Sequence, residues 1–351
     1  MSSKTSFILC TRGSALALAH SRRVQQDLQR VFPAWTFELQ ILKTTGDKLQ
    51  TAALANAETS LPKGLFTKEL EVALLERTAD IAVHSLKDLP TDLPEGLILG
   101  AVAPRADVRD VLVFRSATAA SPVGTKSPAD WSPGARTPFA GKPFDGLAHL
   151  PKGAVVATSS TRRAAQVLAV RPDLQIVPIR GNVGTRLTKI ATDPSIDATI
   201  LAAAGLVRLK LDIGPRGDLR VDPRLQPAER AEVQAPPAGL LATLMDPAEM
   251  IPAVGQGAVG LEIRADDPEV ALVCQALNHP NTMHAVTAER AFLKAMGGGC
   301  QSPVAAYGRV LGHQVDLSAA SFRDGATRRA QERRPIRDAV ALGEALAASL
   351  R

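Results

Sequence analysis

An apolar run, a polar turn and a helical pattern follow one another repeatedly along this chain of 351 residues. The pattern first occurs at 7–31, where the strand-like run 7–10 is followed by a Thr-Arg-Gly-Ser turn and an alanine-rich helix. It recurs at 154–170 and again from 175 onward. Because strands that alternate with helices form mostly parallel sheets covered by helices, the sequence predicts an α/β fold.

The length of the chain predicts two or three domains, because one hydrophobic core rarely serves more than about 300 residues. We expect a first α/β domain at 1–103, completed by a glycine-rich returning segment and strand at 253–278. A second α/β domain is expected at 104–252, and a small α+β domain at 279–351. The returning segment is predicted to act as a hinge between the first two domains.

Two stretches of the second domain are predicted to be insertions. Residues 116–146 are rich in Pro, Gly, Ser and Ala, and 214–247 are rich in Pro and Arg. The last domain is expected to contain a helix ended by Gly297, a hairpin at 304–322 and a final helix at 338–350.

Composition excludes several classes of protein. No run reaches the roughly 18 apolar residues of a membrane span, and the polar N-terminus leads directly into a strand, so we expect a cytoplasmic protein. The three cysteines, Cys10, Cys274 and Cys300, form no C-x-x-C pair, and the histidines show no H-E-x-x-H spacing. We therefore expect no disulfide framework and no metal site.

The net charge of +6 and the pI near 9.4 would permit nucleic-acid binding. Aromatic residues, on which single-stranded bases stack, make up 3% of the chain. Basic residues are also dispersed beside glycines and hydroxyls rather than gathered in one block. This distribution favours several small anionic groups over a polyphosphate backbone, so we expect no nucleic-acid partner.

A polar cluster follows the apolar run Ile81-Ala82-Val83 and ends at a proline. Its members are His84, Ser85, Lys87 and Asp88. Ligands of open α/β sheets bind beyond the carboxyl ends of strands, which makes this cluster a candidate site. The alternative is an ordinary polar loop with a capping aspartate.

Arginines also gather at predicted strand ends and at the helix starts next to them. They are Arg12, Arg162, Arg163, Arg180 and Arg186. Guanidinium groups and helix N-termini together bind carboxylates or phosphates, although a single turn of this kind is usually solvated surface. No turn has the G-x-x-x-x-G-K-[ST] pattern, which argues against nucleotide phosphates.

Three glycines precede Cys300 and leave its sulfur approachable. The alternative is a small buried cysteine behind a helix end. A cysteine hydrolase would also need an oriented histidine, and no spacing in the chain identifies one.

Several of these stretches together carry a resemblance to a known family. In chain order they are Thr11-Arg12-Gly13-Ser14, Lys63-Gly64-Leu65-Phe66, His84-Ser85-Leu86-Lys87-Asp88-Leu89-Pro90, Thr158-Ser159-Ser160 with Arg162-Arg163, Arg180-Gly181-Asn182-Val183 with Thr185-Arg186, Ala253-Val254-Gly255-Gln256-Gly257, and Glu289-Arg290 with Gly298-Gly299-Cys300. The whole resembles the hydroxymethylbilane synthase (porphobilinogen deaminase) family, over nearly the full chain apart from the two insertions.

The resemblance implies two domains like type II periplasmic binding proteins around a cleft, plus a small α+β domain that carries the cofactor cysteine. It implies a transferase that condenses four porphobilinogen molecules head to tail with loss of ammonia, and then releases linear hydroxymethylbilane. The cofactor implied is a dipyrromethane joined through a thioether to Cys300. A monomer is the family expectation.

The resemblance also implies roles for individual residues. Asp88 would be catalytic, because a carboxylate beside the pyrrole N–H stabilises the cation left by ammonia loss. The implied cofactor-binding residues are Ser85, Lys87, Thr158, Ser160, Arg162, Arg163 and Arg186. The implied substrate-binding residues are Arg12, Ser14, Arg180 and Arg186.

The chain departs from relatives at Asn56, where some have lysine, at His20, where they often have glutamine, and at Ser302 beside the cysteine. Two other interpretations stay open. A non-catalytic anion-binding protein of the same shape would explain the arginines but not Asp88 or Cys300. A nucleic-acid-binding protein is permitted by the pI and disfavoured by the composition.

Overall fold

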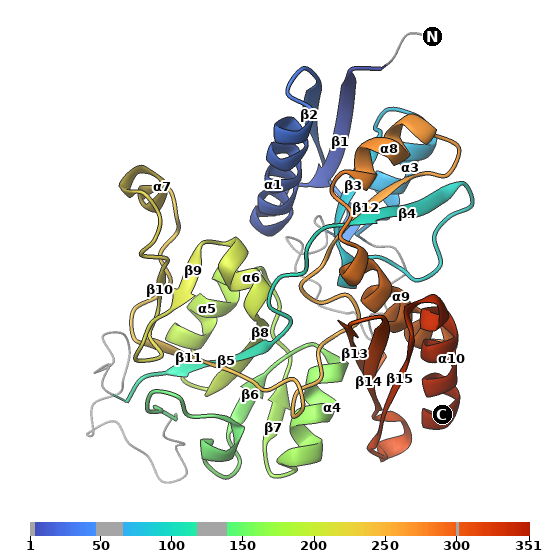
Figure 1. Ribbon diagram of the computed structural model, residues 1–351. Helices are drawn as coiled ribbons and strands as arrows, with labels where there is room; N and C mark the ends of the chain where they lie inside the picture. Colours follow the sequence, from blue (N-terminus) through green and yellow to red (C-terminus); the bar gives the residue numbers. More distant parts are fainter. Residues whose placement is uncertain (1–3, 47–65, 118–138, 300–301) are drawn as a thin grey trace. The chain divides into compact units, whose positions relative to one another are not determined.

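The computed structural model describes residues 4–46, 66–117, 139–299 and 302–351. It divides into two compact units (Figure 1). The first unit is Met1–Asp107 with Ile251–Arg351, and the second unit is Val108–Met250. The second unit lies close to the limits expected for the second domain, whereas a separate third domain at 279–351 stays a prediction.

The first unit contains a five-stranded sheet in the order β2-β1-β3-β12-β4. Its strands are β1 (Ser6–Arg12), β2 (Thr36–Leu42), β3 (Ile81–Ser85), β4 (Leu97–Val102) and β12 (Val259–Arg264). β1 pairs in parallel with β2 and β3, whereas β12 is antiparallel to β3 and β4. The glycine-rich return of the chain therefore places a strand inside this sheet rather than at its edge.

Helices cover both faces of this sheet. On one face, α1 (Ala15–Val31) and α8 (Pro268–Gln275) contribute Leu28 and Val270 to a core with Phe7 and Leu261. On the other face, α3 (Lys68–Leu75) packs Leu70 and Leu74 against Cys10 and Ala82. The central strands β1 and β3 are mostly buried on both faces, so apolar residues occur on both of their sides.

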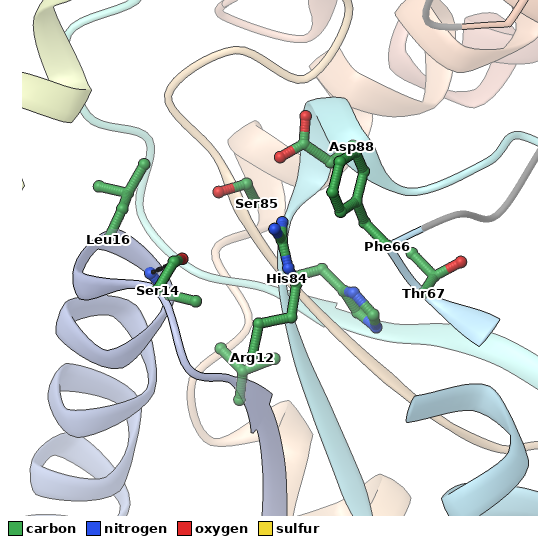
Figure 2. Close-up of a pocket in the computed structure, with 10 residues that line it drawn as sticks. Arg12, Ser14, Leu16, Phe66, Thr67, His84, Ser85 and Asp88 are labelled. Carbon is green, nitrogen blue, oxygen red and sulfur yellow. Dashed lines mark hydrogen bonds between the residues drawn. The ribbon is translucent and has the colours of Figure 1, made fainter. Parts of the chain in front are cut away.

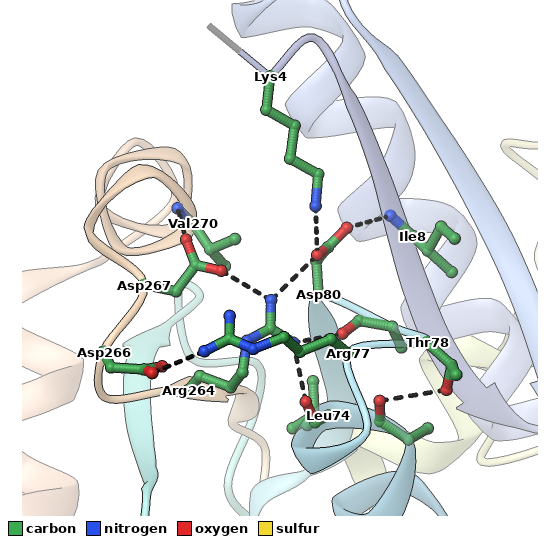
Figure 3. A network of polar contacts seen from close by, with 12 residues as sticks. Lys4, Ile8, Leu74, Arg77, Thr78, Asp80, Arg264, Asp266, Asp267 and Val270 are labelled. Carbon is green, nitrogen blue, oxygen red and sulfur yellow. Dashed lines mark hydrogen bonds and ion pairs between the residues drawn. The ribbon is translucent and has the colours of Figure 1, made fainter. Parts of the chain in front are cut away.

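Charged residues tie the first unit together at the end of the sheet where β3 begins (Figure 3). Arg264 donates to the carbonyls of Leu74 and Ala79, and to the carboxylates of Asp80 and Asp267. Asp80 in turn accepts a hydrogen bond from the Ile8 amide at 2.9 Å. These groups join β1, α3, β12 and the start of α8, at the opposite end of β3 from Asp88.

The C-terminal part of the first unit is a three-stranded antiparallel sheet packed on two helices. Its elements are α9 (Pro280–Ala295), β13 (Val304–Leu311), β14 (Gln314–Ser321), β15 (Arg328–Pro335) and α10 (Ala339–Leu350). The predicted hairpin and both helices are confirmed. β15 was not predicted, because its sequence, RRAQERRP, carries almost no apolar residue and presents alternate side chains to solvent.

The second unit contains a five-stranded sheet in the order β11-β5-β8-β6-β7. Its strands are β5 (Asp110–Arg115), β6 (Val155–Ala157), β7 (Gln175–Val177), β8 (Ala198–Ala202) and β11 (Leu240–Leu244). The helices are α4 (Thr161–Val170), α5 (Val183–Thr192), α6 (Ala203–Arg208) and α7 (Pro227–Ala231), and a small β9 (Leu211–Ile213) and β10 (Leu219–Val221) pair lies beside them. β6 is parallel to β7 and β8, whereas β5 is antiparallel to β8 and β11.

The α/β fold class is confirmed, but the sheets are mixed rather than mostly parallel. Each has two parallel and two antiparallel pairings, because a strand outside the strand–helix alternation, β12 or β5, runs against its neighbours. The stretch expected as an insertion at 214–247 contributes the edge strand β11, whose first three residues are buried. Of the other expected insertion, 118–138 lie outside the described residues, and Phe139 packs against Phe114.

No helix in the described ranges is both long enough and apolar enough to cross a membrane.

Candidate active site

The polar residues at the carboxyl ends of β1 and β3, and directly after them, meet at one edge of the first unit's sheet. The two strands are parallel neighbours, with Leu9 opposite Ile81, so their carboxyl ends face the same side. There they border a pocket, which we call the strand-end pocket (Figure 2). Its lining residues are Arg12, Ser14, Leu16, Ala17, Phe66, Thr67, Val83, His84, Ser85 and Asp88.

Arg12 and the start of α1 give the pocket its positive side. The Arg12 guanidinium lies over the Phe66 ring, 4.2 Å from the ring centroid. This cation–π contact orients the guanidinium. Ser14 caps α1 by accepting a hydrogen bond from the Ala17 amide at 3.3 Å. A guanidinium beside the positive end of a 17-residue helix suits a carboxylate ligand.

Asp88 lies on a short 3-10 turn, η1 (Leu86–Asp88), that follows β3. Its side chain is exposed, whereas Leu86 and Leu89 on either side are buried. Gly255 backs this turn in a left-handed conformation (φ 70°), and a Cβ there would lie 3.1 Å from the Lys87 nitrogen. The returning segment therefore supports the turn from behind while the carboxylate faces the pocket.

Ser85 and Lys87 flank the same turn, and both are half-buried. The Ser85 hydroxyl lies 3.3 Å from Nδ1 of His20, a buried residue of α1. The structure thus brings Arg12, Ser14, Ser85 and Asp88 together, and it places Lys87 beside them.

His84, in contrast, is bound on its other side to the buried core. Its Nε2 lies 2.8 Å from Oε2 of Glu262, and the Glu262 side chain is fully buried. Burial raises the pKa of Glu71 on α3 above its ordinary value, and the charge of Glu262 adds to this effect. A structural role for His84 agrees with these contacts.

Replacing Glu71 by glutamine should make the protein more stable at neutral pH. Because folding raises the pKa of the Glu71 carboxyl, the folded state is destabilised relative to the unfolded state when this carboxyl ionises. The free energy of unfolding of the wild type should therefore fall as pH rises above about 4.3, the pKa of an unfolded glutamate. Glu71→Gln removes that loss. Urea unfolding at pH 5 and pH 8 measures it, with the exposed Glu76→Gln as the control. An equal pH dependence in wild type and Glu71→Gln would contradict the expectation.

In the second unit, α4 begins where β6 ends. The Thr158 hydroxyl accepts from the Ser160 amide at 3.2 Å, and Ser160 caps α4 by accepting from the Arg163 amide. Arg162 and Arg163 are both buried, and each donates an Nη2 hydrogen bond of 2.8 Å to Asp110 on β5. A buried ion-pair cluster therefore engages the two arginines for which the family resemblance implied cofactor binding.

α5 begins in the same way after the neighbouring strand β7. Asn182 caps the helix by accepting from the Thr185 amide at 2.8 Å. Gly181 has a φ of 112°, and a Cβ there would lie 2.7 Å from the Thr185 side chain. Arg186 donates Nε to the Gly181 carbonyl at 2.8 Å, and Arg180 is exposed. Because β6 and β7 are parallel, both helix starts lie at one edge of the second sheet.

Some sequence-based site residues lie outside the described residues, namely Cys300, the Lys63-Gly64-Leu65 stretch and Asn56. The sequence reasoning also missed part of the site. Phe66 was noted within a motif but not as the platform for Arg12, although an aromatic residue just before a helix in a chain so poor in aromatics was an available signal. The assigned roles themselves stay predictions.

Comparison with known proteins extends over almost the whole chain. A family model described as "Porphobilinogen deaminase, dipyromethane cofactor binding domain" matches residues 7–272, and "Porphobilinogen deaminase, C-terminal domain" matches residues 283–351. The porphobilinogen deaminase of Desulforudis audaxviator is 42% identical over 345 residues, covering 98% of this chain and 93% of its own length. That of Geobacter sulfurreducens is 40% identical over 342 residues, covering 97% and 89%.

Proposed function

Since this chain belongs to the porphobilinogen deaminase family, we propose that it is a hydroxymethylbilane synthase with Asp88 as its catalytic residue. The reaction joins four porphobilinogen molecules head to tail, releases four molecules of ammonia, and ends with release of linear hydroxymethylbilane by water. We further propose that the protein works as a monomer in the cytoplasm and without nucleic acid.

The observation that carries the proposal is the strand-end pocket, where a carboxylate and a cation lie at one sheet edge. Porphobilinogen carries an acetate and a propionate group, a pyrrole N–H and an aminomethyl group. Arg12 and the start of α1 suit its carboxylates, and Asp88 suits its N–H. A pocket that only bound anions would gain nothing from the Asp88 carboxylate.

The chemistry assigned to Asp88 is electrostatic. When the carbon–nitrogen bond of the aminomethyl group breaks, its electron pair leaves with ammonia and positive charge spreads to the ring N–H. The Asp88 carboxylate stabilises that charge at the N–H. The methylene carbon then bonds to the unsubstituted α-carbon of the accepting pyrrole, and the proton lost from that carbon balances the step. In this proposal the Asp88 carboxylate also holds or passes on such a proton.

Each unit supplies groups suited to carboxylates, of which a dipyrromethane carries four on its two pyrroles. In the first unit, the proposed donors are Ser85 and Lys87. In the second unit, they are Thr158, Ser160, Arg162, Arg163 and Arg186, at helix starts that favour anions. Arg180 and Arg186 are also proposed to bind the carboxylates of the substrate, together with Arg12 and Ser14. When bound, the dipyrromethane supplies the primer to which the first substrate is joined.

Cys300 is proposed as the attachment residue, and the other two cysteines support this assignment. Cys10 and Cys274 are fully buried, and burial raises the pKa of each thiol to about 12. For Cys10 the nearby charge of Glu262 adds to the effect. Since the thiolate is the reactive form, neither sulfur is suited to attachment near neutral pH.

Intact mass together with porphobilinogen consumption tests the proposal. Wild-type protein should carry the added mass of one dipyrromethane and consume porphobilinogen, and Cys300→Ser should lose both the mass and the activity. Cys274→Ser serves as the matched control and should keep the added mass. A fully active wild-type chain of unmodified mass, or a modified Cys300→Ser, would refute the cofactor assignment. A folded wild-type chain that binds porphobilinogen without consuming it would favour the anion-binding alternative.

A further inference from the structure

Arg290, on the last turns of α9, binds the backbone that directly follows Asp88. Its Nη1 donates to the Leu89 carbonyl at 3.1 Å, and its Nη2 donates to the carbonyls of Pro90 at 2.7 Å and Thr91 at 3.4 Å. This stretch belongs to no helix or strand, and its proline has no N–H to donate. These three carbonyls lie outside the regular helices and strands, and one planar guanidinium donates hydrogen bonds to all of them.

Apolar packing joins the same two parts of the chain. Leu86 and Leu89, which enclose Lys87 and Asp88 in the sequence, lie in a buried cluster with Val286 of α9. Met283, one helical turn before Val286, packs against this cluster as well. The turn that presents Asp88 therefore rests on α9 through side chains on both of its flanks.

α9 is itself held firmly in place at Glu289, the residue next to Arg290. The neighbouring Glu289 is fully buried and accepts hydrogen bonds from Arg105 at 2.5 and 3.0 Å. It also accepts from the amides of Gly255 at 2.7 Å and Gly308 at 2.8 Å. Because Gly255 backs the Asp88 turn, α9 reaches that turn through the returning segment and directly through Arg290.

We propose that Arg290 is a positioning residue for Asp88, fixing the Asp88 turn on the helix that leads along the chain to the glycines before Cys300. The inference rests on the proposed catalytic role of Asp88. Arg290 does not itself line the strand-end pocket. Its effect is to hold the carboxylate where the reacting pyrrole needs it, so its loss acts on turnover more than on substrate binding.

The test compares Arg290→Met, Arg290→Lys and Lys294→Ala. Methionine keeps much of the apolar stem and removes every donor, whereas lysine keeps the charge but replaces the planar fork with a single ammonium. Lys294→Ala is the matched control: Lys294 lies one turn further along α9 and pairs with Asp92 at 2.6 Å, but both side chains are exposed. Such an exposed ion pair contributes little to the free energy of unfolding.

Each purified variant is measured for thermal unfolding, intact mass, kcat and KM. Arg290→Met that is folded and loaded with dipyrromethane should lose about 10- to 100-fold in kcat, the scale of a misplacement near 1 Å, with KM changed much less. Arg290→Lys should recover part of the loss, and Lys294→Ala should match wild type.

A folded, loaded Arg290→Met with wild-type kcat would overturn the inference. If that variant does not fold, Arg290→Lys decides: a lower kcat at wild-type thermal stability supports positioning, and an unchanged kcat overturns it. Wild-type protein that neither carries dipyrromethane nor consumes porphobilinogen would instead refute the proposed function, and this inference with it.

Discussion

Asp88→Asn should fold like the wild type and lose about 100- to 10,000-fold in kcat for porphobilinogen consumption. The side chain is exposed on η1, so its replacement by an amide of the same shape leaves Leu86 and Leu89 in the core. The amide has no negative charge to set against the cation that forms when ammonia leaves. Single-turnover and steady-state assays measure the loss.

The matched control for this prediction is Asp92→Asn. It makes the same chemical change four positions further along the chain, at a side chain that is exposed and does not line the strand-end pocket. We expect it to keep near-normal turnover. Near-normal turnover in Asp88→Asn as well would remove Asp88 from its proposed role, whatever the mass of the protein.

Asp110→Asn should destabilise the protein by about 3–5 kcal/mol, the scale found when one partner of a buried ion pair is removed. Asp110 is fully buried and accepts 2.8 Å hydrogen bonds from both Arg162 and Arg163. Asparagine keeps the volume but leaves two buried guanidinium groups without their counter-charge. Urea unfolding at pH 7 measures the change in the free energy of unfolding.

The pH dependence of this loss identifies its electrostatic origin. Burial alone would raise the pKa of Asp110, but the charges of Arg162 and Arg163 outweigh it and hold the pKa well below its ordinary value. The ion pair therefore stabilises fully above about pH 3.9, the unfolded aspartate pKa, and loses this contribution as pH falls further. The difference between wild type and Asp110→Asn should shrink accordingly.

Asp222→Asn provides the control in the same unit. Asp222 pairs at 2.8 Å with Arg224, whose side chain is largely exposed, so its removal should change the free energy of unfolding little. An equally small effect of Asp110→Asn would show that the buried cluster does not hold the second unit together. It would also return Arg162 and Arg163 to a role in ligand binding alone.

The sequence predicted most elements of this fold because their signals are local. Residues 7–10 were predicted as a strand and lie within β1, and the hairpin predicted at 304–322 is formed by β13 and β14. The helix predicted to follow the Thr-Arg-Gly-Ser turn is α1, and the hydroxyl of Ser14 in that turn caps it. Side-chain alternation, helix caps and the positive φ of Gly297 depend on residues close together in the sequence. Such signals can therefore be identified without knowing which other element the segment packs against.

The candidate site could be predicted from the sequence for a related reason. A polar cluster at the end of an apolar strand indicates the binding edge of an α/β sheet wherever its helices lie. The polar residues that line the strand-end pocket at the ends of β1 and β3 were therefore named from the sequence, whereas Leu16, Ala17, Phe66 and Thr67 were not named as site residues. The Phe66 ring contributes through a contact with Arg12 from a different part of the chain.

By itself, the sequence determined the α/β class, the strand-end position of Asp88 and the helix starts that carry the basic turns. The tertiary structure alone decided which charges meet: Asp110 with Arg162 and Arg163, and Arg290 with the carbonyls after Asp88. It also decided that β12 runs between β3 and β4. These partners lie far apart along the chain, and a buried charge finds its partner only when the whole core closes around it.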